Sequence, residues 1–158
     1  MRRSNKGMSL IELMVAIAII ALIAAVAIPG LLSSKRASNA TAAFANLKSF
    51  STSMSAYIEK QSDQSYPEEI DNIGDYYTHL PKKGGYNYYY LSDVTRFIYY
   101  AYPDSLSNGT KIFFVDESSH LFEAGVDTEN YLIPPTVNLF TTSENRIIEP
   151  NLTWEKKS

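Results

Sequence analysis

The fold is decided by residues 7–32, which read GMSLIELMVAIAIIALIAAVAIPGLL. The last twenty of these residues, 13–32, carry no charge. A helix of that length rises about 30 Å at 1.5 Å per residue, which equals the hydrocarbon thickness of a bilayer. The stretch therefore predicts a helix that can span a membrane.

The flank before this helix is basic, with Arg2, Arg3 and Lys6 and no acid. The positive-inside rule places such a flank in the cytoplasm and the rest of the chain on the other side. Three other interpretations of the stretch compete: a buried core helix, an ordinary signal anchor and a cleavable secretory signal. The last is favoured by Ala25-Val26-Ala27, which has the small-x-small form of a signal-peptidase site.

Glu12 argues against the secretory interpretation. A carboxylate in an apolar helix costs about 2.5 to 3.5 kcal/mol to insert at mid-helix and less near the interface, so it usually has a partner. No Lys or Arg lies within one helical turn of Glu12. Cleavage after Gly7 would free the α-amino group of Met8, whose ordinary pKa is about 7.7 to 8.0. That amine lies four residues before Glu12, on the same helix face.

The segment KGMSLIELM, residues 6–14, resembles the processing motif of type IV prepilins and type II secretion pseudopilins. The resemblance implies that a membrane aspartyl peptidase cuts after Gly7 and methylates the new amine of Met8. It also implies that Glu12 neutralises the N-terminal amine of a neighbouring subunit during assembly. Phe is the commoner residue in the family at the position of Met8.

Pro29-Gly30 lies late in the apolar run, where Pro29 removes one backbone hydrogen bond and disfavours helical geometry at Ile28. Either the helix ends there or it continues with a kink. We expect the kink, because an apolar pattern at three- and four-residue steps resumes and runs to about Gln61. Its members are Ala40, Ala43, Phe44, Leu47, Phe50, Met54, Tyr57 and Ile58. The resemblance likewise implies a loosened helix near this Pro.

Four Tyr-, Phe-, Ile- and Val-rich segments predict strands, separated by turn residues. They are residues 86–91, 96–102, 111–115 and 120–124. Short loops imply an antiparallel meander with one face under the helix and the other in solvent, and hence an α+β, pilin-like fold. Adjacent tyrosines in these strands are expected to alternate between core and surface.

Residues 131–158 show no sustained periodicity and are expected to form a surface tail, pinned by Leu132, Phe140, Ile147 or Trp154. Many proteins of the resembled family close this region with a disulfide, and this chain has no Cys.

The 158 residues suit one compact domain with an appendage. The expected division is a leader at 1–7, a transmembrane or filament-core helix at 8–32, the amphipathic half of the same helix at 33–61, and a globular head with its tail at 62–158.

No nucleophile elbow, phosphate loop or His-Glu-x-x-His pattern is present, so we expect neither an enzyme nor a cofactor. His79 and His120 are expected at the surface or in turns. Hard oxygen ligands for calcium are available in Asp116, Glu117, Asp127, Glu129 and Asn130, but their spacing fits no loop pattern, and no metal is predicted.

Nucleic-acid binding is not expected either. Without the leader, 11 basic side chains face 17 acidic ones, a net charge of −6 that repels phosphate backbones. The remaining basic pair, Lys82-Lys83, is interpreted as a solvated turn.

We therefore expect a structural subunit of a type IV pilus or related filament, with a type II secretion pseudopilin as the alternative. A monomeric membrane-anchored binding protein, and an exported enzyme or lectin cut after Ala27, are weaker alternatives. The expected partners are copies of the chain, minor subunits, prepilin peptidase, inner-membrane assembly machinery and, before assembly, membrane lipid. The precursor would reside in the inner membrane with its head outside the cytoplasm, and the product in a cell-surface or periplasmic filament.

Overall fold

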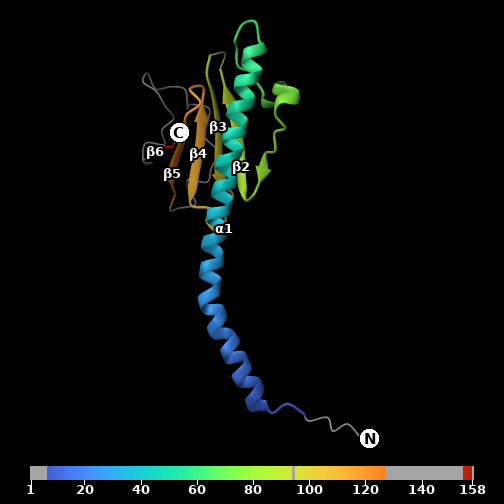
Figure 1. Cartoon of the computed structure of the whole chain (residues 1–158), viewed down its shortest axis with the longest axis vertical. Helices are drawn as coiled ribbons and strands as arrows, with labels where there is room; N and C mark the ends of the chain where they lie inside the picture. The colour runs from blue at the N-terminus through green and yellow to red at the C-terminus, as the bar shows by residue number, and fades with distance from the viewer. Residues whose placement is uncertain (1–6, 94, 127–154, 158) are drawn as a thin grey trace, which may run out of the picture. The chain divides into compact units, whose positions relative to one another are not determined.

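The structure, a computed structural model, describes residues 7–93, 95–126 and 155–157. The chain divides into two compact units, Met1–Ser34 and Lys35–Ser158. Helix α1, Leu10–Lys60, contributes its first half to one unit and its second half to the other (Figure 1). The helix passes through Pro29 without a break and ends one residue before the predicted Gln61.

The second unit is α+β, with the second half of α1 packed on an antiparallel sheet (Figure 1). The described residues form a six-stranded sheet in which each strand pairs with the next along the chain. Its strands are β1 (Lys82–Lys83), β2 (Tyr86–Ser92), β3 (Phe97–Pro103), β4 (Lys111–Asp116), β5 (Leu121–Gly125) and β6 (Glu155–Lys156). A 3₁₀ helix, η1 (Ile70–Tyr76), precedes the sheet. The predicted fold class is therefore confirmed.

A stripe on α1 builds the core against the sheet. Ala43, Leu47, Phe50 and Met54 are buried at steps of four and three residues, the spacing that places side chains on one helix face. Phe50 is fully buried, and its ring stacks on that of Tyr99 in β3 with 4.0 Å between centroids. The C-terminal half of α1 is thus held by aromatic packing.

The second face of the sheet is not left to solvent, and that prediction is wrong for β3 to β5. Every residue of β3 is buried. A second apolar cluster, separate from the one under the helix, contains Ile98, Tyr100, Tyr102, Ile112, Phe114, Phe122, Ala124 and Val126. The sequence of β3, FIYYAYP, is continuously apolar, which is typical of a strand buried on both faces and not of an alternating one.

The expected alternation of adjacent tyrosines between core and surface holds in β2 but not in β3. Tyr88 is buried while Tyr89 is 40% exposed, which confirms alternation in β2. Tyr99 and Tyr100 are both buried because they enter different clusters on opposite faces of β3.

Two smaller predictions also need correction. Lys82-Lys83 is strand β1 and not a turn, and Lys82 Nζ lies 2.7 Å from Asp104 Oδ2. The turn falls at Gly84 and Gly85, whose positive φ angles of 60° and 75° favour glycine. In the predicted tail, Glu155–Lys156 pairs with β5, whereas the proposed anchors Leu132, Phe140, Ile147 and Trp154 lie outside the described residues.

Candidate functional site

The start of α1 holds the residues that the sequence singled out. Gly7 and Met8 are exposed and precede the helix, which begins at Leu10. The backbone N–H of Ser9 donates to Glu12 Oε2 at 3.3 Å, and the N–H of Leu13 donates to the Ser9 carbonyl at 3.2 Å. Ser9 is therefore the N-cap, and the carboxylate of Glu12, three residues later, makes one of the two reciprocal bonds of a capping box.

Sequence reasoning missed this capping role of Glu12, although the Ser-x-x-Glu spacing was readable in the sequence. A carboxylate in the first helical turn also interacts favourably with the positive end of the helix dipole. An ionised carboxylate offers about four lone-pair sites, so one bond to Ser9 leaves room for a cation. Capping and counter-charge are compatible roles for Glu12.

Gly7 is not required by packing within the chain. A Cβ built there meets no heavy atom within 4 Å, and the same holds for Gly30. A requirement for glycine at position 7 would thus come from an enzyme that binds this segment. Pro29 lies inside the continuous helix, while the kink at Pro29-Gly30 remains a prediction.

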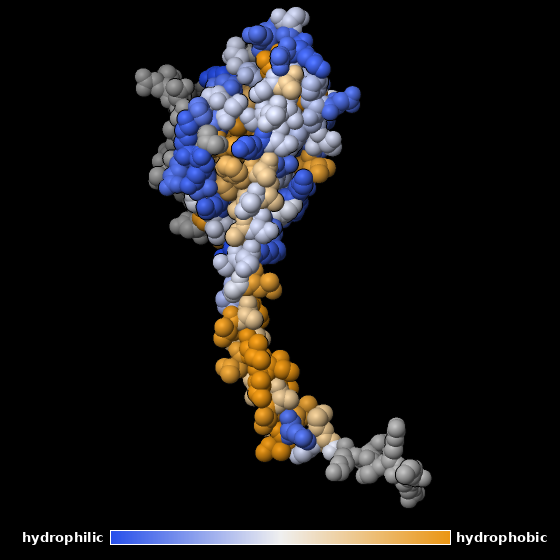
Figure 2. Space-filling model, viewed as in Figure 1, coloured by the Kyte–Doolittle hydropathy of each residue, from blue (hydrophilic) through white to orange (hydrophobic). Residues whose placement is uncertain are grey.

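The first unit exposes an apolar helix surface. Its large apolar side chains within residues 10–31 are between 51% and 77% exposed. Figure 2 shows hydrophobic residues gathered along this part of the helix. Among the described residues, α1 is long and apolar enough to cross a membrane, by length and composition. Burying this surface against lipid or other helices would stabilise the chain.

The head contains a polar cluster inside its aromatic core. Nδ1 of His79 lies 3.1 Å from the hydroxyl of Tyr99, which is also 3.3 Å from that of Tyr77. His79 is therefore half-buried and bonded to the core, which differs from the expected surface position. Burial lowers the pKa of His79, while the negative charge of Asp71 acts in the opposite direction. Burial also raises the pKa of Tyr99 far above its usual range, so its hydroxyl stays protonated.

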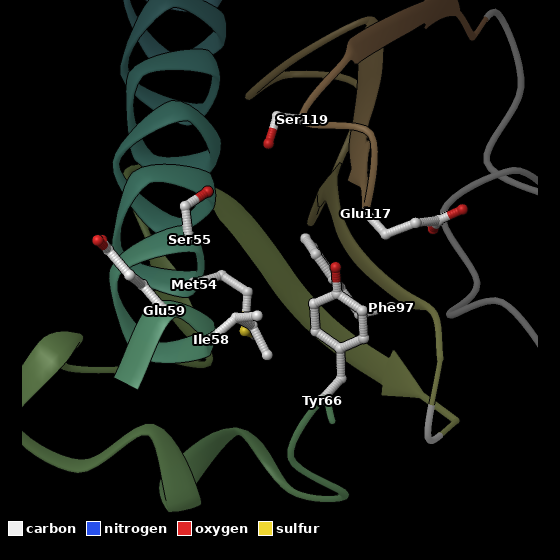
Figure 3. Close-up of a pocket in the computed structure, with 8 residues that line it drawn as sticks. All are labelled: Met54, Ser55, Ile58, Glu59, Tyr66, Phe97, Glu117 and Ser119. Carbon is white, nitrogen blue, oxygen red and sulfur yellow. The ribbon is translucent and has the colours of Figure 1, made fainter. Parts of the chain in front are cut away.

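A surface pocket of about 280 Å³ lies between α1, the loop after it, and the β4–β5 turn (Figure 3). Met54, Ile58 and Phe97 supply apolar walls, and the hydroxyl of Tyr66 points into the space. Figure 3 shows the carboxylates of Glu59 and Glu117, which also line it, pointing away from each other. They are not arranged as a paired acid and base.

The described part of the head also shows no grouped metal ligands: no three His, Asp or Glu side chains there converge to hold an ion. The carboxylate of Asp116 accepts bonds from the backbone N–H and the hydroxyl of Ser118, and the same hydroxyl lies 2.6 Å from Nδ1 of His120. These groups therefore stabilise the β4–β5 turn. The other calcium candidates, Asp127, Glu129 and Asn130, lie outside the described residues.

Comparison with known families gives one match, the prokaryotic N-terminal methylation motif at residues 2–28. A search of curated proteins and a search of solved structures found no match. The chain thus carries the prepilin-type motif of type IV pilins and pseudopilins, which are structural subunits and not enzymes. The motif implies processing by prepilin peptidase and assembly into pilus-like filaments, and with the apolar helix it fits a membrane-anchored precursor.

Proposed function

We propose that the chain is a structural subunit of a type IV pilus or related filament, made as a prepilin and assembled through its N-terminal helix. The observation that carries the proposal is the exposed apolar surface of residues 10–31, which follows directly on the prepilin-type motif. Such a surface is stable in lipid before assembly and against the helices of other subunits afterwards. In this proposal the precursor lies in the inner membrane with its head outside the cytoplasm.

Processing after Gly7 supplies the charge that Glu12 lacks. The new α-amino group of Met8 is methylated, remains a cation near neutral pH, and pairs with Glu12 of a neighbouring subunit. Glu12 keeps its bond to the Ser9 amide in the meantime, since a carboxylate can accept both. The carboxylate therefore links the start of its own helix to the next subunit.

Intact mass and filament recovery test the proposal together. The filament fraction sheared from native cells should contain a chain that begins at Met8, with one added methyl group. A mature chain that begins at Met1 or Ile28 contradicts processing after Gly7.

The motif is shared by pilins and pseudopilins, so the choice of a pilus within that class is part of the proposal. Surface filaments at native expression support the pilus. Filaments confined to the periplasm, together with loss of protein secretion when the gene is deleted, support a type II secretion pseudopilin instead.

A further inference from the structure

The charges of the chain are segregated along α1. Residues 13–58 contain no Asp or Glu, and their three cations are Lys35, Arg36 and Lys48. Residues 59–158 carry eight basic and sixteen acidic side chains, a net charge of −8. An acidic head is repelled by an anionic bilayer, whereas the acid-free helix is not. Lys35 and Arg36 lie where the apolar run ends.

The position of this pair matches the headgroup layer. Along a helix with a rise of about 1.5 Å per residue, Lys35 and Arg36 lie roughly 4.5 and 6 Å beyond Leu32. A bilayer whose hydrocarbon core is bounded by Leu32 places lipid phosphates at this depth, because each headgroup layer is roughly 5 to 7.5 Å thick. Lys48 lies about 24 Å beyond Leu32 along the helix and is therefore outside the headgroup layer.

The described residues do not neutralise the pair. Within the part of the chain that the structure describes, the ion pairs involve neither Lys35 nor Arg36. Arg36 is half-buried, and its Nε is shielded from solvent and has no hydrogen-bond acceptor among the described residues. The planar fork of a guanidinium matches phosphate oxygens, and a neighbouring ammonium adds a second positive charge.

We propose that Lys35 and Arg36 form a binding site for the phosphate of an anionic phospholipid while the subunit resides in the membrane. The inference rests on the membrane-inserted precursor of the proposed function and not on filament formation. The site favours phosphatidylglycerol over a zwitterionic lipid, because two cations that the described residues leave unpaired attract a headgroup with a net negative charge. Lipid would therefore neutralise the pair until assembly removes the subunit from the bilayer.

The test uses the full-length precursor in vesicles of phosphatidylcholine with a minor fraction of phosphatidylglycerol. Native mass spectrometry measures which lipid stays bound after gentle release. The wild-type chain should retain phosphatidylglycerol preferentially. Lys35→Gln with Arg36→Gln should reduce this preference by roughly fivefold for each cation removed. Lys48→Gln is the matched control and should keep it, as should Arg36→Lys.

Two further arms separate the explanations. Circular dichroism and vesicle flotation should show the same helix content and insertion for all variants, so that a lost preference reports binding and not misfolding. An unchanged preference in the double variant, or an equal loss in Lys48→Gln, overturns the site. Displacement of phosphatidylglycerol by inorganic phosphate, but not by chloride at the same ionic strength, overturns the assignment to lipid and identifies a general phosphate site. None of these readouts depends on filaments, so failure of the pilus proposal would be seen separately.

Discussion

Replacing Glu12 tests the proposed assembly site, because the observed bond to Ser9 and the proposed counter-charge respond differently to substitution. Glu12→Ala removes the acceptor of the Ser9 N–H and the negative charge together. Glu12→Gln retains an oxygen that can accept the same N–H but loses the charge. We expect filament yield to fall from wild type to Gln to Ala, while membrane insertion remains unchanged in both variants.

The magnitudes of the two roles differ. Loss of an N-terminal capping interaction typically costs about 0.5 to 2 kcal/mol, and the exposed 3.3 Å bond to Ser9 belongs at the low end. An amine buried between helices without its carboxylate costs about 3 to 5 kcal/mol. A loss of about 3 kcal/mol, the lower end of the second range, changes the equilibrium constant of each contact roughly 150-fold. Repeated along a filament, only the second cost is large enough to abolish extension.

The assay is filament yield from sheared or imaged cells, measured with subunit levels in the membrane and protease resistance of the head. Ser9→Ala is the matched control, because it keeps the backbone N–H that Glu12 accepts and should assemble nearly as the wild type does. Wild-type yield from Glu12→Ala, with the protein otherwise intact, refutes the counter-charge. If Glu12→Gln gives wild-type yield and Glu12→Ala does not, assembly does not require the negative charge, and only the capping bond to Ser9 remains as the role of Glu12.

Three further outcomes are expected. Gly7→Arg should remain uncleaved in the membrane, because a long charged side chain does not fit an enzyme site that accepts glycine, whereas Gly7→Ala adds a single methyl group and should still be processed; normal trimming of Gly7→Arg, seen by intact mass, would contradict the cleavage site. Phe50→Ala should lower the unfolding free energy of the head by about 3 to 5 kcal/mol in urea titrations of detergent-solubilised chain, since the ring is fully buried; exposed Thr52→Ala is the control, and an equal effect would refute the core assignment. The pKa of His79 is lower in the folded head than its ordinary value of about 6.5. As pH falls below about 6.5, this residue therefore binds more protons in the unfolded chain than in the folded one. Stability should therefore fall as pH drops below that value and through the lowered pKa, and a His79→Gln variant with the same slope of urea midpoint against pH would contradict this contribution.

Helix α1 and the central strands were predictable because their sequence signals are long and periodic. The helical stripe from Ala43 to Met54 repeats over several turns, and the four predicted strands agree with β2 to β5 to within one residue at each end. The short elements carried no such signal. Two-residue strands such as β1 and β6 are defined by a partner strand and not by their own sequence.

Burial on the second sheet face was missed for a different reason. The prediction assumed that one helix covers one face, although β3 is apolar at consecutive positions. A continuous apolar run indicates burial on both faces, and this signal should outweigh a topological assumption. At the N-terminus, the spacing of Gly7, Met8 and Glu12 suggested a chemical role, but that role depends on an enzyme and a second subunit. The Ser9–Glu12 bond, in contrast, is local and was available from the sequence.

The contrast between the two halves of α1 bears on how copies would find their register. In the second half, a stripe that includes Leu47 and Phe50 fixes one face against the sheet. In residues 13–32 the helix is apolar on every side, which suits lipid and neighbouring helices alike but specifies no axial position. Within residues 8–58, Glu12 is the one acidic side chain. A single buried polar group can set register in packed helices. In the proposed filament, Glu12 would therefore determine the axial offset between subunits, while the surrounding apolar surface supplies affinity.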